Sequence, residues 1–342
     1  MSKHGRKIHE GNALNRDFIA MTVPVYLMAF FFYGPRALLL GLVGVLTARI
    51  TDRFAAVLRG RRYDSTENSS VVIALILVLM LPATVPYSLV VMAVLVAVLV
   101  GKEAFGGYQS YPFNPSAVGF CVAAVSWPQQ VFRYPAPLNW MLQENLTFEQ
   151  LLSLWRFEGV TLVEGPSMTL RNGGLPRIDF WDLLLGNYAG PMGLCCSLVI
   201  LSCAVYLLVR RRISVLAPAG FLAVVCLIAF VFPRYSEIFF ATFPQDVIQR
   251  LQVVKFELLS GAIIFASVFM ISEPGTLPKN PLSRLIYGIL LGFATMMFRY
   301  FGTYELGTCF AILLVNAVSG YFDRAIASRS AKKKAALTTA SP

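Results

Sequence analysis

The stretch Leu77-Val-Leu-Met-Leu-Pro-Ala-Thr-Val-Pro86 resembles Ser267-Val-Phe-Met-Ile-Ser-Glu-Pro-Gly-Thr-Leu-Pro278, apart from a two-residue insertion in the second copy. A second matching pair, Phe105-Gly-Gly-Tyr108 and Phe301-Gly-Thr-Tyr304, precedes the last apolar segment of each half of the chain. Leucine-rich helices can resemble one another by composition alone. The shared methionine, proline and Phe-Gly-x-Tyr landmarks nevertheless favour an internal repeat. The chain is therefore predicted to consist of two related halves.

The composition is that of a membrane protein. Of the 342 residues, 57% are hydrophobic and only 14% are charged, whereas soluble domains carry about 25% charged residues. Several apolar runs approach the ~20 residues that a helix needs to cross a bilayer. A β-barrel would instead show alternating apolar and polar residues. These features predict an all-α polytopic membrane protein.

Ten apolar segments are candidate transmembrane helices, at residues 18–34, 36–58, 69–82, 86–101, 114–127, 190–209, 213–232, 256–272, 284–298 and 306–322. Several are short and bounded by Pro or Gly, which is typical of discontinuous helices in inverted-repeat folds. Each half holds five segments, an odd number, so the second half would enter the membrane from the opposite face. The prediction is two inverted five-helix repeats.

The basic residues predict the orientation of these helices. Most of the 29 lysines and arginines fall on one side if the N-terminus is cytoplasmic, and cytoplasmic loops carry such an excess. The predicted parts are a cytoplasmic tail (1–17), the first repeat (18–127), an extracytoplasmic connection (128–189), the second repeat (190–325) and a basic cytoplasmic tail (326–342). Because the positive charge is explained by topology and contact with the lipid bilayer, no nucleic-acid partner is expected.

Metal and haem chemistry have little support in the sequence. None of the six cysteines forms a CxxC pair, so neither an iron–sulfur nor a zinc site is expected from this chain alone. The two histidines, His4 and His9, lie in the N-terminal tail, which excludes a bis-histidine haem inside the membrane. The span interiors are almost free of ionisable side chains, unlike those of an autonomous ion pump.

Three stretches carry a more specific signal. They are Gly101-Lys-Glu-Ala-Phe-Gly-Gly-Tyr-Gln-Ser-Tyr-Pro-Phe-Asn-Pro-Ser-Ala-Val-Gly119, the pair Glu164-Gly-Pro-Ser-Met-Thr-Leu170 and Leu184-Leu-Gly-Asn-Tyr-Ala-Gly-Pro-Met-Gly193, and Phe269-Met-Ile-Ser-Glu-Pro-Gly-Thr-Leu-Pro278. In this order and spacing, the chain resembles the D subunit of the Rnf-type ion-translocating electron transport complex. That protein is related to the B subunit of the sodium-pumping NADH–quinone oxidoreductase. The resemblance covers about residues 18 to 325.

The resemblance implies FMN held covalently through a threonine phosphoester in an extracytoplasmic loop. Carried over, Thr169 would provide the hydroxyl, Ser167 and Gly165 would belong to the recognised turn, and Glu164 would be its acidic position. Two nearby residues, Arg171 and Arg177, could pair with the flavin phosphate or simply form a solvated loop face.

The chain also departs from the family pattern. Its attachment motif is one residue shorter, with Met168 in place of Gly-Ala. An asparagine expected before Pro-Phe-Asn-Pro is Tyr111, and the Asp-Pro after the eighth span is Glu273-Pro274. A paralogue that keeps the fold but carries no flavin is therefore an alternative.

A second, non-covalent site is suggested by four residues, Asn114, Pro115, Glu273 and Thr276, which interrupt helices in corresponding or neighbouring places of the two halves. Helix breaks leave backbone groups available to a ligand. The resemblance leaves open whether such a place holds riboflavin, lines an electron path or is purely structural.

The resemblance implies a multi-pass component of a bacterial inner-membrane translocase, a ferredoxin:NAD type oxidoreductase that exports Na⁺ or H⁺, rather than an enzyme by itself. Its partners would be the other membrane and peripheral subunits, with a flavin transferase for maturation. Two alternatives remain: a cofactor-free scaffold subunit, and a solute permease or channel built from the same kind of repeats.

Overall fold

A computed structural model describes residues 3–60, 67–108, 110–138, 160–194, 196–236, 238, 246–304 and 306–339. Residues 139–159 of the predicted connection lie outside this part. In chain order the elements are α1 (Lys3–Tyr33), α2 (Pro35–Leu58), α3 (Ser69–Leu79), α4 (Tyr87–Val96), η1 (Ala97–Lys102, a π-helix), η2 (Glu103–Phe105, a 3₁₀-helix), α5 (Pro115–Ser126), α6 (Pro128–Val131), β1 (Tyr134–Pro135), β2 (Leu162–Val163), α8 (Pro166–Arg171), α9 (Phe180–Leu185), α10 (Ser197–Val209), α11 (Leu216–Val231), α12 (Val247–Leu259), α13 (Ile263–Phe269), α14 (Pro281–Phe301) and α15 (Thr308–Thr339).

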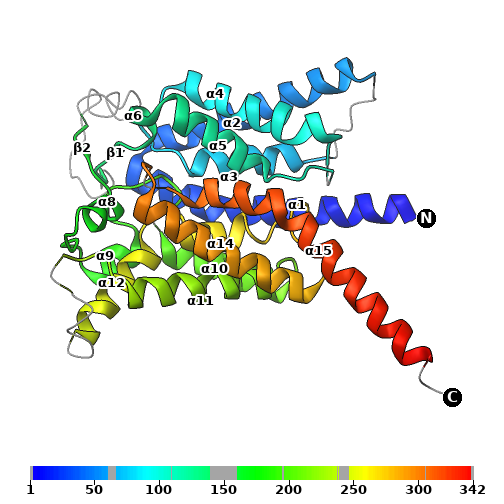
Figure 1. Ribbon diagram of the computed structural model, residues 1–342. Coiled ribbons are helices and arrows are strands. Elements are labelled where there is room, and N and C mark those ends of the chain that lie inside the picture. The colour runs from blue at the N-terminus through cyan, green and yellow to red at the C-terminus, as the bar shows by residue number, and fades with distance from the viewer. Residues whose placement is uncertain are drawn as a thin grey trace.

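The helices form a bundle whose two ends differ. The start of α1 and the end of α15 extend from one end, whereas β1, β2, α8 and α9 lie at the other (Figure 1). The charge pattern predicts the same relation, with both termini opposite the 128–189 connection. We refer to these as the terminal end and the connection end.

The structure is that of a multi-pass membrane protein, although its helices differ in length from the predicted spans. A helix overlaps each of the ten predicted ranges; α1, α14 and α15 extend beyond theirs, whereas α3, α4 and α10 are shorter. In the part of the chain that the structure describes, four helices are long and apolar enough to cross a membrane, or five spans if α12 and α13, bent by 47°, count as one. Large apolar side chains point outward, Leu27 being 58% and Leu227 62% exposed. The count of ten spans and the inverted repeats stay predictions.

Proline begins five helices, α2, α5, α6, α8 and α14. Its fixed φ suits the first helical turn, where its missing N–H group would have no partner. Before α2, Gly34 adopts a φ of 73°, which is readily accessible to glycine. Proline at these positions therefore divides the apolar chain into many separate helices.

The segment before α10 is the clearest difference from the prediction. A span was expected from residue 190, but α10 begins at Ser197. Residues 192 and 193 instead donate backbone N–H groups to carbonyl groups at the end of α3: Met192 to Leu81 (3.1 Å) and Gly193 to Leu79 (2.8 Å). A Cβ on Gly193 would lie 2.5 Å from that of Leu79. The Gly-Pro-Met-Gly stretch thus satisfies carbonyls that the broken helix leaves unpaired.

Glycines allow α11 and α14 to approach closely. A Cβ on Gly288 would clash with the Ala217 carbonyl oxygen, and one on Gly292 would lie 2.8 Å from the Phe221 carbonyl oxygen. Their four-residue spacing places both on one face of α14, which is a common way for membrane helices to pack backbone against backbone.

Gly288→Val is expected to destabilise the protein by about 1–3 kcal/mol, because the new side chain must push α11 and α14 apart. Thermal unfolding of the purified full-length chain in detergent would measure the loss. Gly320→Val is the control, since an added Cβ there meets nothing within 4 Å. Equal unfolding temperatures for the two variants would contradict this packing.

Candidate functional site

The predicted attachment motif forms a short helix, α8. Gly165 precedes it in an extended conformation and its carbonyl oxygen accepts the N–H of Met168 at 2.9 Å. Ser167 and Leu170 are buried. Leu170 belongs to a small apolar cluster with Val253 and Phe256 of α12, so α8 is held against α12 by one face.

Thr169 is half-buried on α8. Its hydroxyl forms no hydrogen bond within the described residues, while its carbonyl oxygen accepts the N–H of Gly174 at 3.0 Å. Arg171 is also held in place, because its guanidinium donates to the Thr303 carbonyl oxygen at 2.6 Å. Arg177 is exposed and lies outside this contact. The structure therefore places Thr169 and Arg171 on the same short helix, and Arg177 lies beyond its end.

A cavity of about 490 Å³ lies beside α8. Its volume falls in the range of about 300–1,000 Å³ that is usual for small-molecule sites. The lining residues come from two stretches of the connection and from the segment that follows α14: Pro128, Gln129, Phe132, Arg133, Leu162, Val163, Glu164, Gly165, Met168, Thr303 and Tyr304. Glu164 and Gly165 of the motif thus line the cavity, and Thr169 directly follows the lining residue Met168.

Aromatic rings lead from this cavity into the bundle. The rings of Phe132 and Tyr304 are stacked, with centroids 5.2 Å apart and planes 15° apart. Tyr304 stacks in turn on Phe310 of α15, with centroids 5.6 Å apart. Part of the cavity wall is therefore aromatic, and the Phe301-Gly-Thr-Tyr304 landmark supplies one of its rings.

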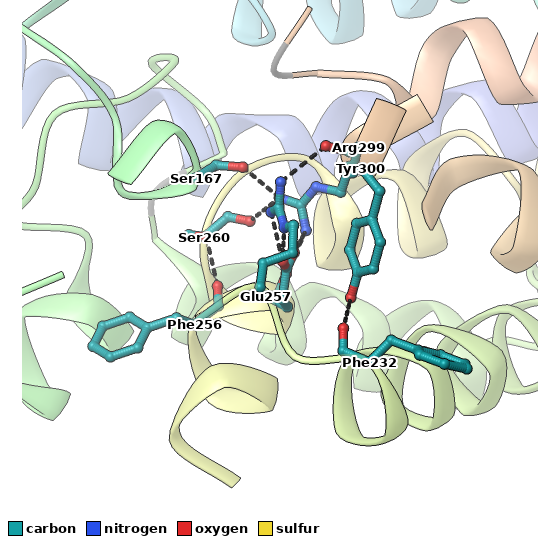
Figure 2. Close-up of polar contacts among 8 residues, drawn as sticks. Ser167, Phe232, Phe256, Glu257, Ser260, Arg299 and Tyr300 are labelled. Atoms are coloured by element: carbon teal, nitrogen blue, oxygen red, sulfur yellow. Dashed lines mark hydrogen bonds and ion pairs between the residues drawn. The ribbon is translucent and has the colours of Figure 1, made fainter. Parts of the chain in front are cut away.

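A network of buried charged side chains lies against α8. Glu257 of α12 is fully buried and accepts from Arg299 of α14 and from Arg234, which follows α11, each at 2.5 Å. The Arg234 guanidinium also stacks over the Tyr300 ring at 5.2 Å. Figure 2 shows Glu257, Ser260 and Ser167 gathered around the Arg299 guanidinium, with Tyr300 beside it. One carboxylate thus neutralises one of two guanidinium groups.

Arg299 connects this network to the attachment helix. Its guanidinium donates to the Ser167 hydroxyl at 3.2 Å and to the Ser260 carbonyl oxygen at 2.9 Å. Ser260 and Gly261 form the break between α12 and α13, and Gly261 has a φ of 78°. Arg299 therefore caps the end of α12 and holds α8 at the same time.

The residues of the predicted second, non-covalent site lie towards the terminal end of the bundle. The Asn114 side chain caps α5 through the Ala117 N–H (3.1 Å) and donates to the Glu273 carboxylate (2.7 Å) and the Met270 carbonyl oxygen (3.2 Å). Pro115 is the first residue of α5. Glu273 also accepts from the Tyr111 hydroxyl at 2.6 Å. The two positions that depart from the family pattern, Tyr111 and Glu273, therefore contact each other.

This second group encloses little space. The cavity beside Tyr111 and Glu273 measures about 30 Å³, room for about one water molecule and far less than a flavin requires. Thr276 is buried, and its hydroxyl has no hydrogen-bond partner among the described residues. In this conformation the helix breaks mainly satisfy each other.

Burial raises the pKa of the Glu273 carboxyl from 4.5 to about 7, although the hydrogen bond from Tyr111 acts in the opposite direction. The folded state therefore keeps this proton at pH values where the unfolded chain loses it. Its stabilising contribution is complete below pH 4.5 and is lost as the pH rises to about 7, by at most about 3 kcal/mol.

We expect Glu273→Gln to remove this pH dependence. Unfolding temperatures of the wild type should fall relative to those of the variant between pH 4.5 and 7, and then run parallel to them. Glu164→Gln, at an exposed carboxylate, should leave the wild-type profile unchanged. Parallel curves for the wild type and Glu273→Gln across this whole range would refute the prediction.

A third polar cluster surrounds Lys102, at the end of η1. The buried ammonium group contacts Glu67 at 2.7 Å, Asp52 at 3.3 Å and Glu103 at 3.5 Å, and it donates to the Ser70 hydroxyl at 2.8 Å. The sequence places these charges at the ends of spans, but only the structure shows that they pack around one another.

Several site residues were not predicted from the sequence, namely Phe132, Arg234, Glu257, Arg299 and Tyr304. Glu257 and Arg299 were placed at span ends, with no indication that they pair. The usable signal was an arginine in the last turn of an apolar helix, directly before the repeated Phe-Gly-x-Tyr landmark. No group of His, Cys, Asp and Glu suited to a metal ion occurs among the described residues.

Comparison with known proteins identifies related chains. The profile of the NQR2, RnfD, RnfE family matches residues 1–332. The D subunit of the ion-translocating oxidoreductase complex of Haemophilus influenzae (strain PittEE) is 28% identical over 328 residues, covering 87% of each chain. Its namesake from Alcanivorax borkumensis is 28% identical over 336 residues, covering 94% of this chain and 93% of the relative. The D subunit of the proton-translocating ferredoxin:NAD(+) oxidoreductase complex of Clostridium ljungdahlii is 24% identical over 306 residues, covering 90% and 87%.

Proposed function

The chain belongs to the NQR2, RnfD, RnfE family, and from this premise we propose that it is the D-type membrane component of an ion-translocating oxidoreductase complex. It carries electrons through FMN attached covalently to Thr169 and couples their transfer to export of Na⁺ or H⁺. The electron donor and acceptor are of the ferredoxin and NAD type. Its partners are the other membrane and peripheral subunits, and a flavin transferase that attaches the FMN.

The observation that supports this proposal is the position of α8, which carries Thr169. The helix is anchored by the buried residues Ser167 and Leu170, and Met168, the neighbour of Thr169, lines a cavity of about 490 Å³. The helix is at the connection end, opposite both termini (Figure 1). The charge pattern favours cytoplasmic termini, which places α8 on the outer side of the proposed bacterial inner membrane. A flavin transferase on that side could reach Thr169.

The residues present suit FMN. When bound, FMN supplies one-electron transfer. Thr169 would hold it through a phosphoester, and Arg171 lies two residues away. Phe132, Tyr304 and Arg133 line the same cavity and bring aromatic surface and a positive charge to its wall. The departure at Met168 fits as well, because Met168 itself lines the cavity and brings apolar surface to it.

We further propose that the membrane helices form two inverted five-helix repeats, and that these repeats move relative to each other during electron transfer. Helix breaks at matching places of the two repeats, after α3 and after α13, support this proposal. Because Asn114 and Glu273 enclose only about 30 Å³, a riboflavin molecule there would require the helix breaks to open. We therefore propose one covalent flavin as the cofactor of this chain in this conformation.

Intact-mass spectrometry of the full-length chain, co-produced with a flavin transferase, tests the proposal together with in-gel fluorescence after denaturation. A fluorescent band with the added mass of one FMN unit is expected. An unmodified, dark band would remove the electron-carrier function and favour a cofactor-free scaffold subunit.

A permease or channel is the alternative from another functional class, since inverted repeats also build transporters. Vesicles that contain this chain alone distinguish the two. The proposed electron carrier should support no solute uptake in the absence of its partners, whereas a permease should do so without flavin.

A further inference from the structure

A basic pocket lies at the terminal end of the bundle, far from α8. It encloses about 280 Å³ between the α10–α11 turn and the α13–α14 connection. The first segment contributes Arg211, Arg212 and Ser214, and the second contributes Lys279 and Arg284. In the sequence, these residues form two separate groups of positive charge, and they indicate only which ends of the helices face the cytoplasm. The structure brings them together around one space.

Backbone and side-chain contacts hold the pocket in shape. The Arg284 guanidinium donates to the Pro278 carbonyl oxygen at 2.9 Å and to the Ser214 hydroxyl at 3.4 Å, and so ties the two segments together. Arg211 has a φ of 54°, a conformation that is uncommon for a residue with a side chain. The N–H groups of Lys279 and Asn280 are held by the Asp323 carboxylate, each at 3.2 Å.

The pocket keeps a positive charge. Arg212 is paired with Asp17 of α1 at 2.5 Å. Within the described part of the chain, no ion pair involves Arg211, Lys279 or Arg284. The four cations outnumber the two carboxylates beside them, Asp17 and Asp323. They therefore repel one another, and an anion between them relieves that repulsion. Arginine and lysine side chains are the usual partners of phosphate groups.

Exposed apolar side chains adjoin these cations. Val209 is 77% exposed at the end of α10, Val215 is 59% exposed just before α11, and Leu282 is 56% exposed at the start of α14. Exposed apolar side chains of this kind are expected in the hydrocarbon region of the membrane. The basic pocket would then lie beside them, at the membrane surface. A molecule with an anionic head and apolar chains matches both features.

We propose that this pocket binds the phosphate headgroup of an anionic phospholipid, with the acyl chains lying along the exposed faces of α10, α11 and α14. Basic pockets between membrane helices are suited to such headgroups. The proposal does not depend on flavin, so it stands or falls separately from the proposed electron transfer.

Native mass spectrometry of the full-length chain, released from micelles with equal amounts of phosphatidylglycerol and phosphatidylcholine, tests it. The wild type should retain phosphatidylglycerol preferentially. In the triple variant Arg211→Gln, Lys279→Gln, Arg284→Gln, the ratio of retained phosphatidylglycerol to retained phosphatidylcholine should fall at least about tenfold. Because Arg284 also supports the local fold, the double variant Arg211→Gln, Lys279→Gln, at two exposed residues, should show a smaller loss with unchanged unfolding temperature.

The matched control is Arg16→Gln, Arg210→Gln, Arg324→Gln, which removes the same charge from outside the pocket and should keep the preference. Equal losses in both triple variants would show diffuse attraction and overturn the proposal. So would a wild type that retains both lipids equally. Displacement of the lipid by a few millimolar inorganic phosphate would assign the pocket to a free anion instead of a lipid.

Discussion

Thr169→Ala is expected to abolish covalent flavin completely, whereas Thr169→Ser should retain it, because only the hydroxyl takes part in the phosphoester. The neighbouring hydroxyl of Ser167 cannot replace it. Ser167 is 2% exposed and accepts a hydrogen bond from Arg299, so a transferase has no access to it. Intact mass and in-gel fluorescence of the denatured chain measure the loss.

Thr161→Ala provides the control for this prediction, since Thr161 is exposed in the same connection but lies before β2. It should leave the flavin in place. A flavin that persists in Thr169→Ala would move the attachment to another hydroxyl, such as Thr303 at the cavity wall, and peptide mapping would identify it. The electron-carrier function would then survive while the assigned anchor would be wrong.

The local sequence predicts an attachment site, but it does not predict the residues that support it. Turn residues and a hydroxyl in one short stretch are a local signal, and they single out Thr169 in the connection. The supports of that hydroxyl come from elsewhere: Arg299 and Thr303 follow more than a hundred residues later. Such contacts depend on how α14 packs against α12, which no local pattern encodes.

The helices show the same limit. Apolar runs correctly indicated where helices lie, since a helix overlaps each predicted range. They overestimated the length of the helix at residues 190–194, where the chain forms a turn and the N–H groups of Met192 and Gly193 bond to carbonyl groups at the end of α3. Hydropathy describes the surroundings of a segment, and those surroundings are equally apolar for a helix and for a turn buried in the bundle.

Two residues at which we expect the sequence to depart from the family pattern lie together in the structure. The Tyr111 hydroxyl donates to the Glu273 carboxylate at 2.6 Å, and the Asn114 side chain donates to the other oxygen of that carboxylate at 2.7 Å. This contact joins stretches more than 150 residues apart, so neither stretch indicates it by itself.

Glu257→Gln is expected to cause the largest loss of stability, about 3–5 kcal/mol, because it leaves two guanidinium groups buried without a counterion. Arg299→Gln should cost less, since Glu257 keeps its pair with Arg234. Combining the two changes should cost less than the sum of the single effects. Thermal unfolding of the purified full-length chain gives all four values of this double-mutant cycle.

Asp17→Asn is a close control, because Asp17 also sits between two arginines, Arg210 and Arg212. Those guanidinium groups are 54% and 27% exposed, so water can solvate them after the change. The expected cost is therefore below about 1 kcal/mol. Similar losses in Asp17→Asn and Glu257→Gln would mean that burial does not set the strength of the inner network.

Arg299→Gln should also act on α8 specifically, because it removes the donor to Ser167 and the cap of the α12–α13 break. Amide hydrogen exchange of flavin-free protein should accelerate at least about tenfold in residues 164–172 and 257–262, while α2 and α3 stay protected. Ser167→Ala should accelerate exchange only in the first of these segments. Uniform acceleration throughout the bundle would instead make Arg299 a general structural residue, without a particular role in holding the attachment helix.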